Sequence, residues 1–343
     1  MNHFKYQNGI SLVEVMVSMV ISLFLLGGII QVYLANKTSY SFSNALSRIQ
    51  ENGRYSLDTM VQDSRLAGFF GCAIYDPTDT DTIVNNLNPA GPGYDAALHD
   101  FIGAGLLEGT DNDGLNGSDS ITLRGAKPGQ VNVYPPYNVS TSATIFVGNN
   151  DRLKSGDIVM VSNCRGADIF QISNTTKGSG AAKDAVVHNT GASTEPGNYN
   201  PDNCKGGNAH CLSQTYGSDA SMFELQAVTY TIAVGESGEP ALWRSENGTN
   251  LELIEGIEQM QILYGVDTDD DDFPNRYVVS TAVADMLDVI AIRLMLLVRS
   301  ESDFITEDVQ QFTYNGANVT ATDQRLRQVF STTIALRNRI GDS

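Results

Sequence analysis

The sequence is poor in basic residues. Its 21 lysines and arginines face 40 aspartates and glutamates, which gives a formal net charge of −19. A surface with this balance repels phosphate backbones and anionic lipid headgroups. Direct nucleic-acid binding is therefore not expected. The 343 residues, 41% of them hydrophobic, can still form a core in one large or two small domains.

Motifs of common enzyme classes are missing as well. The sequence has no G-x-S-x-G nucleophile elbow, no H-E-x-x-H zinc motif and no P-loop. None of the four histidines, His3, His99, His188 and His210, lies near a nucleophile motif. The sequence therefore predicts no enzyme and no cofactor, apart from a candidate calcium ion in an acidic loop. The alternative to a non-enzymatic protein is a membrane-anchored periplasmic enzyme. Such an enzyme would need catalytic residues that the sequence does not show.

The N-terminal region lacks charge and a signal-peptidase site. No residue between Glu14 and Lys37 is charged, and the segment from Ile10 to Leu34 can span a bilayer, since about 20 apolar residues suffice. No A-x-A-like site follows this segment, as it would in a secretory signal peptide. Lys5 lies on the short N-terminal side of this segment. Its charge predicts that the leader lies inside the membrane boundary of the cell and that the rest of the chain lies outside.

Proline is absent before Pro77, and beyond Leu34 the pattern becomes amphipathic. The apolar stripe consists of Phe42, Leu46, Ile49, Leu57, Met60 and Val61. The polar side consists of Arg48, Glu51, Arg54, Asp58 and Gln62. These features predict one helix from about Ser11 to Leu66, about 80 Å long, with a bend at Gly53.

The N-terminal residues resemble those of a known family. Gly9, the apolar Ile10, "SLVE" and a long apolar helix are similar to the class III signal of type IV pilins and pseudopilins. The resemblance implies that a prepilin peptidase cuts after Gly9 and methylates the new amino group of Ile10. Most members have Phe where this chain has Ile10. Glu14 becomes the fifth residue of the mature chain.

Glu14 is an acid near the N-terminal end of the apolar segment. A charged acid at the centre of such a helix costs about 2.5–3.5 kcal/mol on insertion scales. The resemblance implies that Glu14 pairs with the Ile10 ammonium of a neighbouring subunit during fibre assembly. The alternative is a Glu14 that lies near the lipid interface and is hydrated. In related systems the subunit at the very tip tends to lack this Glu, which implies a position just below the tip here.

The rest of the chain has short apolar segments separated by Gly, Asn, Asp and Pro, which predicts strands. The expected strands are 120–125, 130–134, 143–148, 157–162, 167–173, 223–234, 241–245, 288–300 and 328–338, with a strand, a turn and a strand in 250–265. Segment 281–287 is expected to form a helical turn. Segments 76–118 and 174–219 are predicted to be long loops or a small inserted lobe.

Four cysteines allow three disulfide connectivities if the head lies outside the cytoplasm. We favour Cys72–Cys164, which would tie the helix end to a strand, and Cys204–Cys211, which are close in sequence. Free buried thiols are one alternative. A zinc site from Cys204, His210 and Cys211 is another, although adjacent His210 and Cys211 suit tetrahedral ligation poorly and no fourth ligand is apparent.

The stretch "DTDDDDFPNRY" opens at Asp267. Asp267, Asp269 and Asp271 match the first, third and fifth ligand positions of an EF-hand loop. The match then fails, because Asp272 occupies the glycine position and Val278 the position of the bidentate Glu. Two interpretations of this stretch stay open. It is either a calcium site whose remaining ligands differ from those of an EF-hand, or a solvated acidic loop.

The sequence predicts an α+β, type IV pilin-like fold with a long N-terminal helix on a mostly antiparallel β-rich head. Its expected parts are a leader (1–9), a transmembrane helix half (10–34), an amphipathic half (35–67) and a periplasmic head (68–343).

Several stretches of the chain are similar to PilW-type minor pilins. They are "ALSRIQENGRYSLDTMVQDSRLAGFFGC", "NGSDSITLRG", "NCRGADIFQI", "IEQMQILYGVDTD" and "FSTTIALRNR". The resemblance implies a structural protein that primes pilus assembly in the inner membrane and then lies at or near the fibre tip. Implied partners are the prepilin peptidase, the inner-membrane assembly platform, membrane lipid, the other minor pilins, the major pilin and a tip adhesin. A minor pseudopilin of type II secretion is the related alternative.

Overall fold

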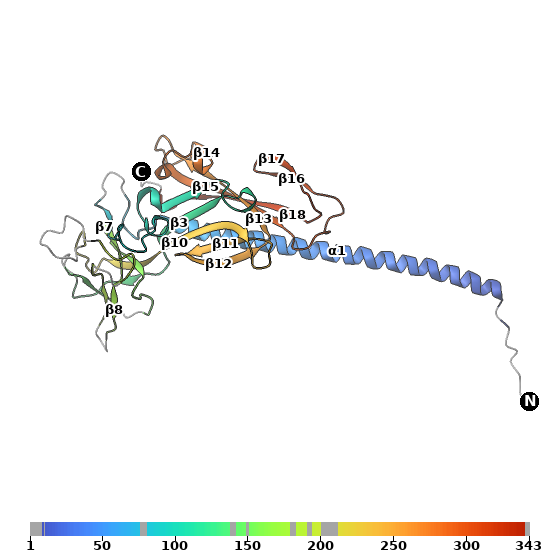
Figure 1. Cartoon of the computed structure of the whole chain (residues 1–343), viewed down its shortest axis with the longest axis horizontal. Coiled ribbons are helices and arrows are strands. Elements are labelled where there is room, and N and C mark those ends of the chain that lie inside the picture. The colour runs from blue at the N-terminus through green and yellow to red at the C-terminus, as the bar shows by residue number, and fades with distance from the viewer. Residues whose placement is uncertain are drawn as a thin grey trace, which may run out of the picture.

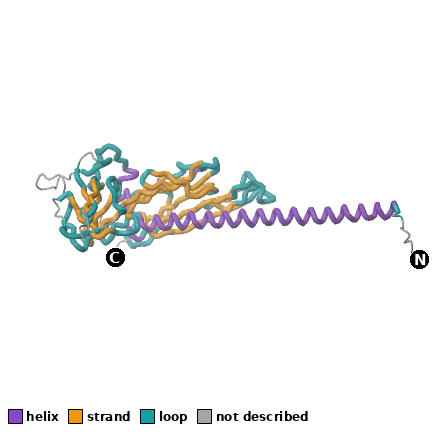
Figure 2. Tube along the Cα trace, turned by 90° about the horizontal axis from the view of Figure 1, so that it is seen from below, coloured by secondary structure: helices purple, strands orange, loops and turns teal. Residues whose placement is uncertain are grey.

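The computed structural model describes residues 9, 11–75, 81–137, 142–148, 151–178, 183–190, 194–199 and 212–339. It consists of a long helix and a β-rich head, and the C-terminal half of the helix lies along the head (Figures 1 and 2). Helix α1 spans Leu12–Leu66, a length of about 80 Å at 1.5 Å per residue. The predicted long helix is confirmed.

One face of the C-terminal half of α1 packs on the head. Its buried residues recur every three or four positions and are Ile49, Gly53, Ser56, Met60 and Ser64. All five residues predicted for the polar side are exposed.

Gly53 allows close packing between helix and head. A Cβ atom at this position would lie 2.5 Å from a ring carbon of Phe330 in strand β18 (Arg327–Ala335). The sequence had suggested a bend at this glycine. Contact with an aromatic ring on a distant strand is a tertiary effect that a helix pattern cannot reveal.

The main sheet has nine strands in the order β1-β7-β6-β10-β11-β12, with β3 and β4 also paired to β10 and β2 paired to β3. Among the described strands, every pairing is antiparallel except β1 with β7. The strand bounds are β1 (Ile83–Asn85), β2 (Leu107–Thr110), β3 (Ser120–Ala126), β4 (Val131–Asn132), β6 (Ile158–Asn163), β7 (Gly166–Gln171), β10 (Ser221–Val234), β11 (Pro240–Glu246) and β12 (Thr249–Glu255).

A second sheet has the order β14-β13-β15-β18, and two small sheets complete the head. Their strands are β13 (Ile257–Val266), β14 (Arg276–Val278), β15 (Val289–Arg299), β5 (Thr144–Val147), β9 (Asp184–Val187), β8 (Asn174–Thr176), β16 (Gln311–Tyr314) and β17 (Ala317–Thr320). The short helices are α2 (Ala96–His99), η1 (Gly103–Leu106), η2 (Leu115–Gly117), η3 (Ser280–Ala282), η4 (Met286–Asp288) and η5 (Arg337–Arg339).

The head has more than one hydrophobic core. The largest joins α1 to both large sheets, through residues such as Met60, Tyr230 and Leu294. A separate core, which includes Ile145 and Phe170, lies at the end of the head far from the N terminus (Figure 1). The α+β, pilin-like fold predicted from the sequence is confirmed.

The two segments predicted as loops or a lobe contain regular elements. Segment 76–118 contributes β1, α2 and β2, and segment 174–219 contributes β8 and β9. These strands have only three or four residues, too few to show an alternating pattern. Their pairing with neighbouring strands, which the sequence does not reveal, holds them in place.

Candidate functional site

Helix α1 begins with a capping box. The Ser11 hydroxyl accepts a hydrogen bond from the backbone N–H of Val13 at 3.2 Å, and the Glu14 carboxylate accepts one from the backbone N–H of Ser11 at 3.0 Å. These bonds satisfy N–H groups that a helix start leaves free. Sequence reasoning considered Glu14 as an ion-pair partner or as a hydrated carboxylate and missed this role. The signal was present, because S-x-x-E before an apolar run is the capping-box pattern.

The expected cleavage site lies just before this box. Gly9 is exposed, and no atom lies within 4 Å of its Cβ position. Ile10, the expected site of methylation and the source of the pairing ammonium, lies outside the described residues. Cleavage, methylation and the ion pair of Glu14 therefore stay predictions.

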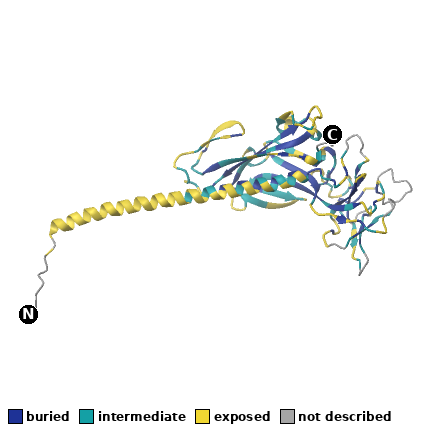
Figure 3. Cartoon of the chain, turned by 180° about the vertical axis from the view of Figure 1, so that it is seen from behind, coloured by how far each residue is buried: buried dark blue, intermediate teal, exposed yellow. Residues whose placement is uncertain are grey.

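The N-terminal half of α1 has no protein around it. Every residue from Ser11 to Tyr40 is exposed, including Phe24 at 79% and Leu12 at 75% (Figure 3). By length and composition the helix can cross a membrane. A helix that is apolar on all sides is normally surrounded by lipid or by other helices, so this surface needs such a cover.

The other half of α1 is fixed to the head by polar contacts as well as by its core. The Asp63 carboxylate accepts hydrogen bonds from the Tyr230 hydroxyl at 2.6 Å and from Arg244 Nε at 2.9 Å. Burial, together with the nearby Asp63 charge, raises the pKa of Tyr230 far above its ordinary value, so the phenol remains a donor. Nearer the membrane segment, Arg48 pairs with Glu301 at 2.7 Å.

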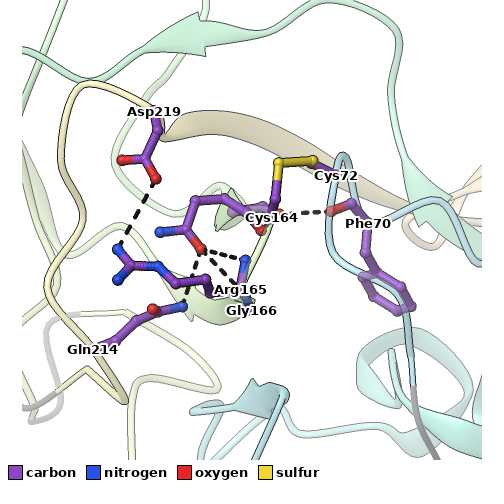
Figure 4. The surroundings of a disulfide bond; sticks show 9 residues. Phe70, Cys72, Cys164, Arg165, Gly166, Gln214 and Asp219 are labelled. Atoms are coloured by element: carbon purple, nitrogen blue, oxygen red, sulfur yellow. Dashed lines mark hydrogen bonds and ion pairs between the residues drawn. A yellow bond between two sulfur atoms is a disulfide. The ribbon is translucent and has the colours of Figure 1, made fainter.

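A disulfide joins the end of α1 to the main sheet. Cys72 and Cys164 are bonded, with their Cα atoms 4.5 Å apart, across a sequence separation of 92 residues. Beside the disulfide, whose surroundings are shown in Figure 4, the Ser162 hydroxyl donates to the backbone carbonyl of Phe70 at 2.7 Å. The bond therefore closes a contact that hydrogen bonding also supports, as predicted for this pair. Cys204 and Cys211, as well as the zinc alternative with His210, lie outside the described residues.

The acidic loop brings together the three aspartates predicted as ligands. Asp267, Asp269 and Asp271 each place a carboxylate oxygen within 4.8 Å of those of the other two. Asp267 is 6% exposed and accepts hydrogen bonds from the backbone N–H groups of residues 269, 270 and 272, at 3.1, 3.0 and 2.9 Å.

These bonds order the loop without a cation. Burial opposes ionisation of Asp267, but the backbone N–H groups outweigh it and lower the pKa of this carboxyl. Asp269 and Asp271 remain exposed and are geometrically able to bind calcium. The calcium site stays a prediction.

The two described histidines are both packed against aromatic rings in the head. His99 lies 5.3 Å from the ring of Tyr94, and His188 lies 4.7 Å from the ring of Phe170, measured between ring centroids. His3 and His210 lie outside the described residues.

Comparisons with known proteins match two parts of the chain. Residues 4–30 match the family model described as the prokaryotic N-terminal methylation motif. Residues 229–338, which contain the second sheet and the C-terminal part of β10, match the model described as type IV pilus-assembly protein W. No curated protein and no solved structure matches the chain.

Pilin-family domains are structural, and membership in a pilus-assembly family implies contact with other pilus components. The methylation motif and the uncovered apolar helix together indicate a membrane-anchored pilin. With its long helix, its β-rich head and these two matches, the chain is consistent with a PilW-type minor pilin of the type IV pilus.

Proposed function

We propose that this minor pilin primes type IV pilus assembly in the inner membrane and is then incorporated at or near the tip of the fibre. One observation carries the proposal: a carboxylate, Glu14, lies in the first turn of a helix whose N-terminal half, up to Tyr40, is exposed at every residue. Neighbouring helices in a fibre would cover that surface. A neighbour's terminal ammonium would offset the cost of placing Glu14 among them.

The capping box supports a two-stage role for Glu14. Before assembly, the bond to the Ser11 N–H gives the carboxylate a partner within its own chain. On assembly, the carboxylate exchanges part of this contact for the ammonium of a neighbouring chain cut after Gly9. The ammonium adds a full positive charge, which the backbone N–H lacks, so the exchange favours assembly.

The proposed partners follow from these stages. The prepilin peptidase would remove residues 1–9 in the inner membrane, and the assembly platform would extract the helix from the lipid. Other minor pilins and the major pilin would pack against residues 11–40, which are exposed throughout. The end of the head opposite the N terminus would be free for a tip adhesin (Figure 1).

Glu14→Gln tests the proposal. Gln keeps the acceptor of the capping box but removes the charge. An unpaired partner charge costs about 3–5 kcal/mol when fully buried, and less near an interface. We therefore expect a variant that is processed and stays in the inner membrane, but is depleted from sheared pili and copurifies less of the other minor pilins.

Ser11→Ala is the matched control, because it removes a cap acceptor and keeps the Glu14 charge. It should enter pili at close to the wild-type level. If Glu14→Gln enters pili as well as the wild type, the hydrated-carboxylate alternative is correct. Deletion of the gene distinguishes a role in the type IV pilus from a role in type II secretion. Loss of secretion with a normal number of pili would identify a secretion pseudopilin instead.

A further inference from the structure

A cavity of about 280 Å³ lies in the head where the main sheet meets the loops of its distal part. Its walls come from α2, the start of β6, the end of β7, the first part of β10 and the turn between β11 and β12. Small-molecule sites usually measure about 300–1,000 Å³. A cavity at the lower end of that range suits one small ring rather than a peptide.

Some of the polar side chains that line the cavity lack part of their hydrogen-bond partners. Among these side chains, His99 is the most deeply buried. It is 8% exposed, and its Nδ1 accepts a hydrogen bond from the backbone N–H of Asp95 at 2.9 Å. Burial lowers the pKa of His99, so the ring is neutral at pH 7 and carries its proton on Nε2. Within the described part of the chain, no acceptor lies within hydrogen-bond distance of this Nε2–H. An unpaired donor on a ring that is only 8% exposed and lines the cavity points to an acceptor inside the cavity.

Three carboxylates face the same space. Asp157 uses one oxygen to accept the backbone N–H of Lys154 at 2.7 Å, which leaves the other oxygen available. Glu224 is paired with Lys127 at 2.5 Å, and Glu195 is exposed at the wall. The cavity therefore offers several strong acceptors and is acidic overall.

A second donor and a rigid frame complete the cavity. The side-chain carbonyl of Asn247 accepts the backbone N–H of Ala227 at 2.8 Å, which leaves its NH₂ group to donate. Gln171 has its side-chain hydrogen bonds satisfied by the backbones of Gly156, Glu195 and Gly197, at 2.8 to 2.9 Å. The wall between Asp157 and Glu195 is thus held in one conformation before any ligand binds, which reduces the entropy lost on binding.

We propose that this cavity binds a single sugar ring. Sugar hydroxyls both donate and accept, so one ring can donate to Asp157 and Glu195 while it accepts from His99. A simple cation would leave the buried His99 donor unsatisfied, and the carboxylates would repel an anion. Leu98, Ile158 and Leu225 supply apolar surface for the C–H groups of the ring. A free monosaccharide and the end of a glycan chain present the same chemistry.

The cavity lies away from the membrane segment. Strand β7, which carries Gln171, is at the end of the head opposite the N terminus (Figure 1). A chain anchored by its N-terminal helix would present this end outward. The inference concerns ligand binding alone and does not depend on priming or on Glu14.

Saturation-transfer NMR on the full-length protein tests the proposal. The protein is held in lauryldimethylamine oxide micelles, because this detergent has no sugar headgroup. We expect transfer to galactose and to glucosamine, and none to N-acetylneuraminic acid, because its carboxylate is repelled. Asp157→Asn and Glu195→Gln should each weaken binding by roughly tenfold or more, as expected for loss of a hydrogen bond to a charged group. Asp308→Asn, an equal charge change on an exposed loop outside the cavity, should not weaken it.

Comparison of a terminal galactose on a glycan array with free galactose then identifies the source of the ring. Preference for either one supports the proposal. Absence of transfer to any sugar overturns it, as does transfer that both cavity variants leave unchanged. Stronger transfer to N-acetyl-lysine amide than to the sugars also overturns it, because the cavity would then receive a basic side chain. Glu195→Gln keeps the test valid if Asp157→Asn fails to fold, since the Glu195 side chain is exposed.

Discussion

Single residues at the N terminus order the start of helix α1. Ser11 and Glu14 satisfy backbone groups at the helix start, so the first turn is ordered without a partner chain. Gly9 precedes this ordered first turn and is exposed. An accessible glycine just before a capped helix is a suitable substrate for a peptidase that must recognise both.

Processing is the first prediction at this scale. The intact mass of the mature protein should show that residues 1–9 are missing and that Ile10 carries a methyl group. Gly9→Val should block both changes, because a branched side chain replaces the small residue at the cleavage point. Gly28→Ala, in the same apolar segment, should be processed normally. Protein that retains Met1, or that is cut after Leu34, would contradict the resemblance.

The acidic loop provides the second prediction. If calcium binds Asp267, Asp269 and Asp271, a chelator should lower the melting temperature of the protein, and added calcium should restore it. Asp269→Ala should abolish that response while it leaves the backbone bonds of Asp267 intact. Asp308→Ala is the control, since it removes an exposed acid elsewhere. Identical melting curves in calcium and in chelator would show that the loop is a solvated acidic surface.

Residue roles could be predicted from the sequence only where a local pattern carries them. The Asp267 cluster was found because its ligand spacing is local, and the capping box of Glu14 could have been found in the same way. The role proposed for His99 could not, because Asp157 and Glu195, which line the same cavity, are far from it in sequence. Such clusters require knowledge of strand pairing.

At the scale of elements, the contact between α1 and β18 depends on a glycine. The third prediction is that Gly53→Ala destabilises the head, because the new methyl group meets the Phe330 ring. Overpacking costs about 1–3 kcal/mol, and the higher helix propensity of Ala returns about 1 kcal/mol at most. Urea unfolding should therefore show a net loss of stability.

Gly28→Ala is the control for this effect. It makes the same change in the same helix, at a position with no neighbour within 4 Å, so only the helix-propensity gain applies. If Gly53→Ala is as stable as Gly28→Ala, the Phe330 ring moves aside and the glycine is not required there.

The elements themselves could largely be predicted from the sequence. Long segments with a clear period, such as α1 and β10, were found because many residues repeat the same signal. The hairpin of β16 and β17 was not found, because β17 is exposed along its whole length and has no buried face to set a pattern. Its register depends on its partner strand.

At the scale of the whole molecule, the disulfide links the helix to the rest of the head. The fourth prediction in this Discussion is that Cys72→Ser with Cys164→Ser lowers the free energy of unfolding by about 4–5 kcal/mol, the loop-entropy value for this separation. Cys204→Ser with Cys211→Ser should cost about 2.5 kcal/mol, because a shorter loop would be closed.

Urea unfolding of both double variants and non-reducing peptide mapping of the wild type measure these effects. A Cys72–Cys164 variant as stable as the wild type would show that packing alone holds the helix end. Crossed connectivity in the peptide map would contradict the pairing of Cys204 with Cys211.

The overall architecture was predicted because each of its large parts has its own signal. The apolar run, the amphipathic stripe and the strand-rich remainder together indicate a helix on a sheet. The division of the head into several cores was not predictable, because β10 carries side chains into more than one of them and the sequence does not say which.

The position of the disulfide also has a mechanical consequence. In a fibre of the kind proposed, a pull on the N-terminal helix would be opposed by whatever holds the head. Tension along the backbone reaches Cys72 and crosses the sulfur bridge directly to Cys164. When the load is applied at a residue after Cys164, the tension bypasses residues 73–163. The strands of this segment, β1 to β6, then carry no tension along the backbone. The covalent bridge, rather than the hydrogen bonds of those strands, then sets the force that this part of the head withstands.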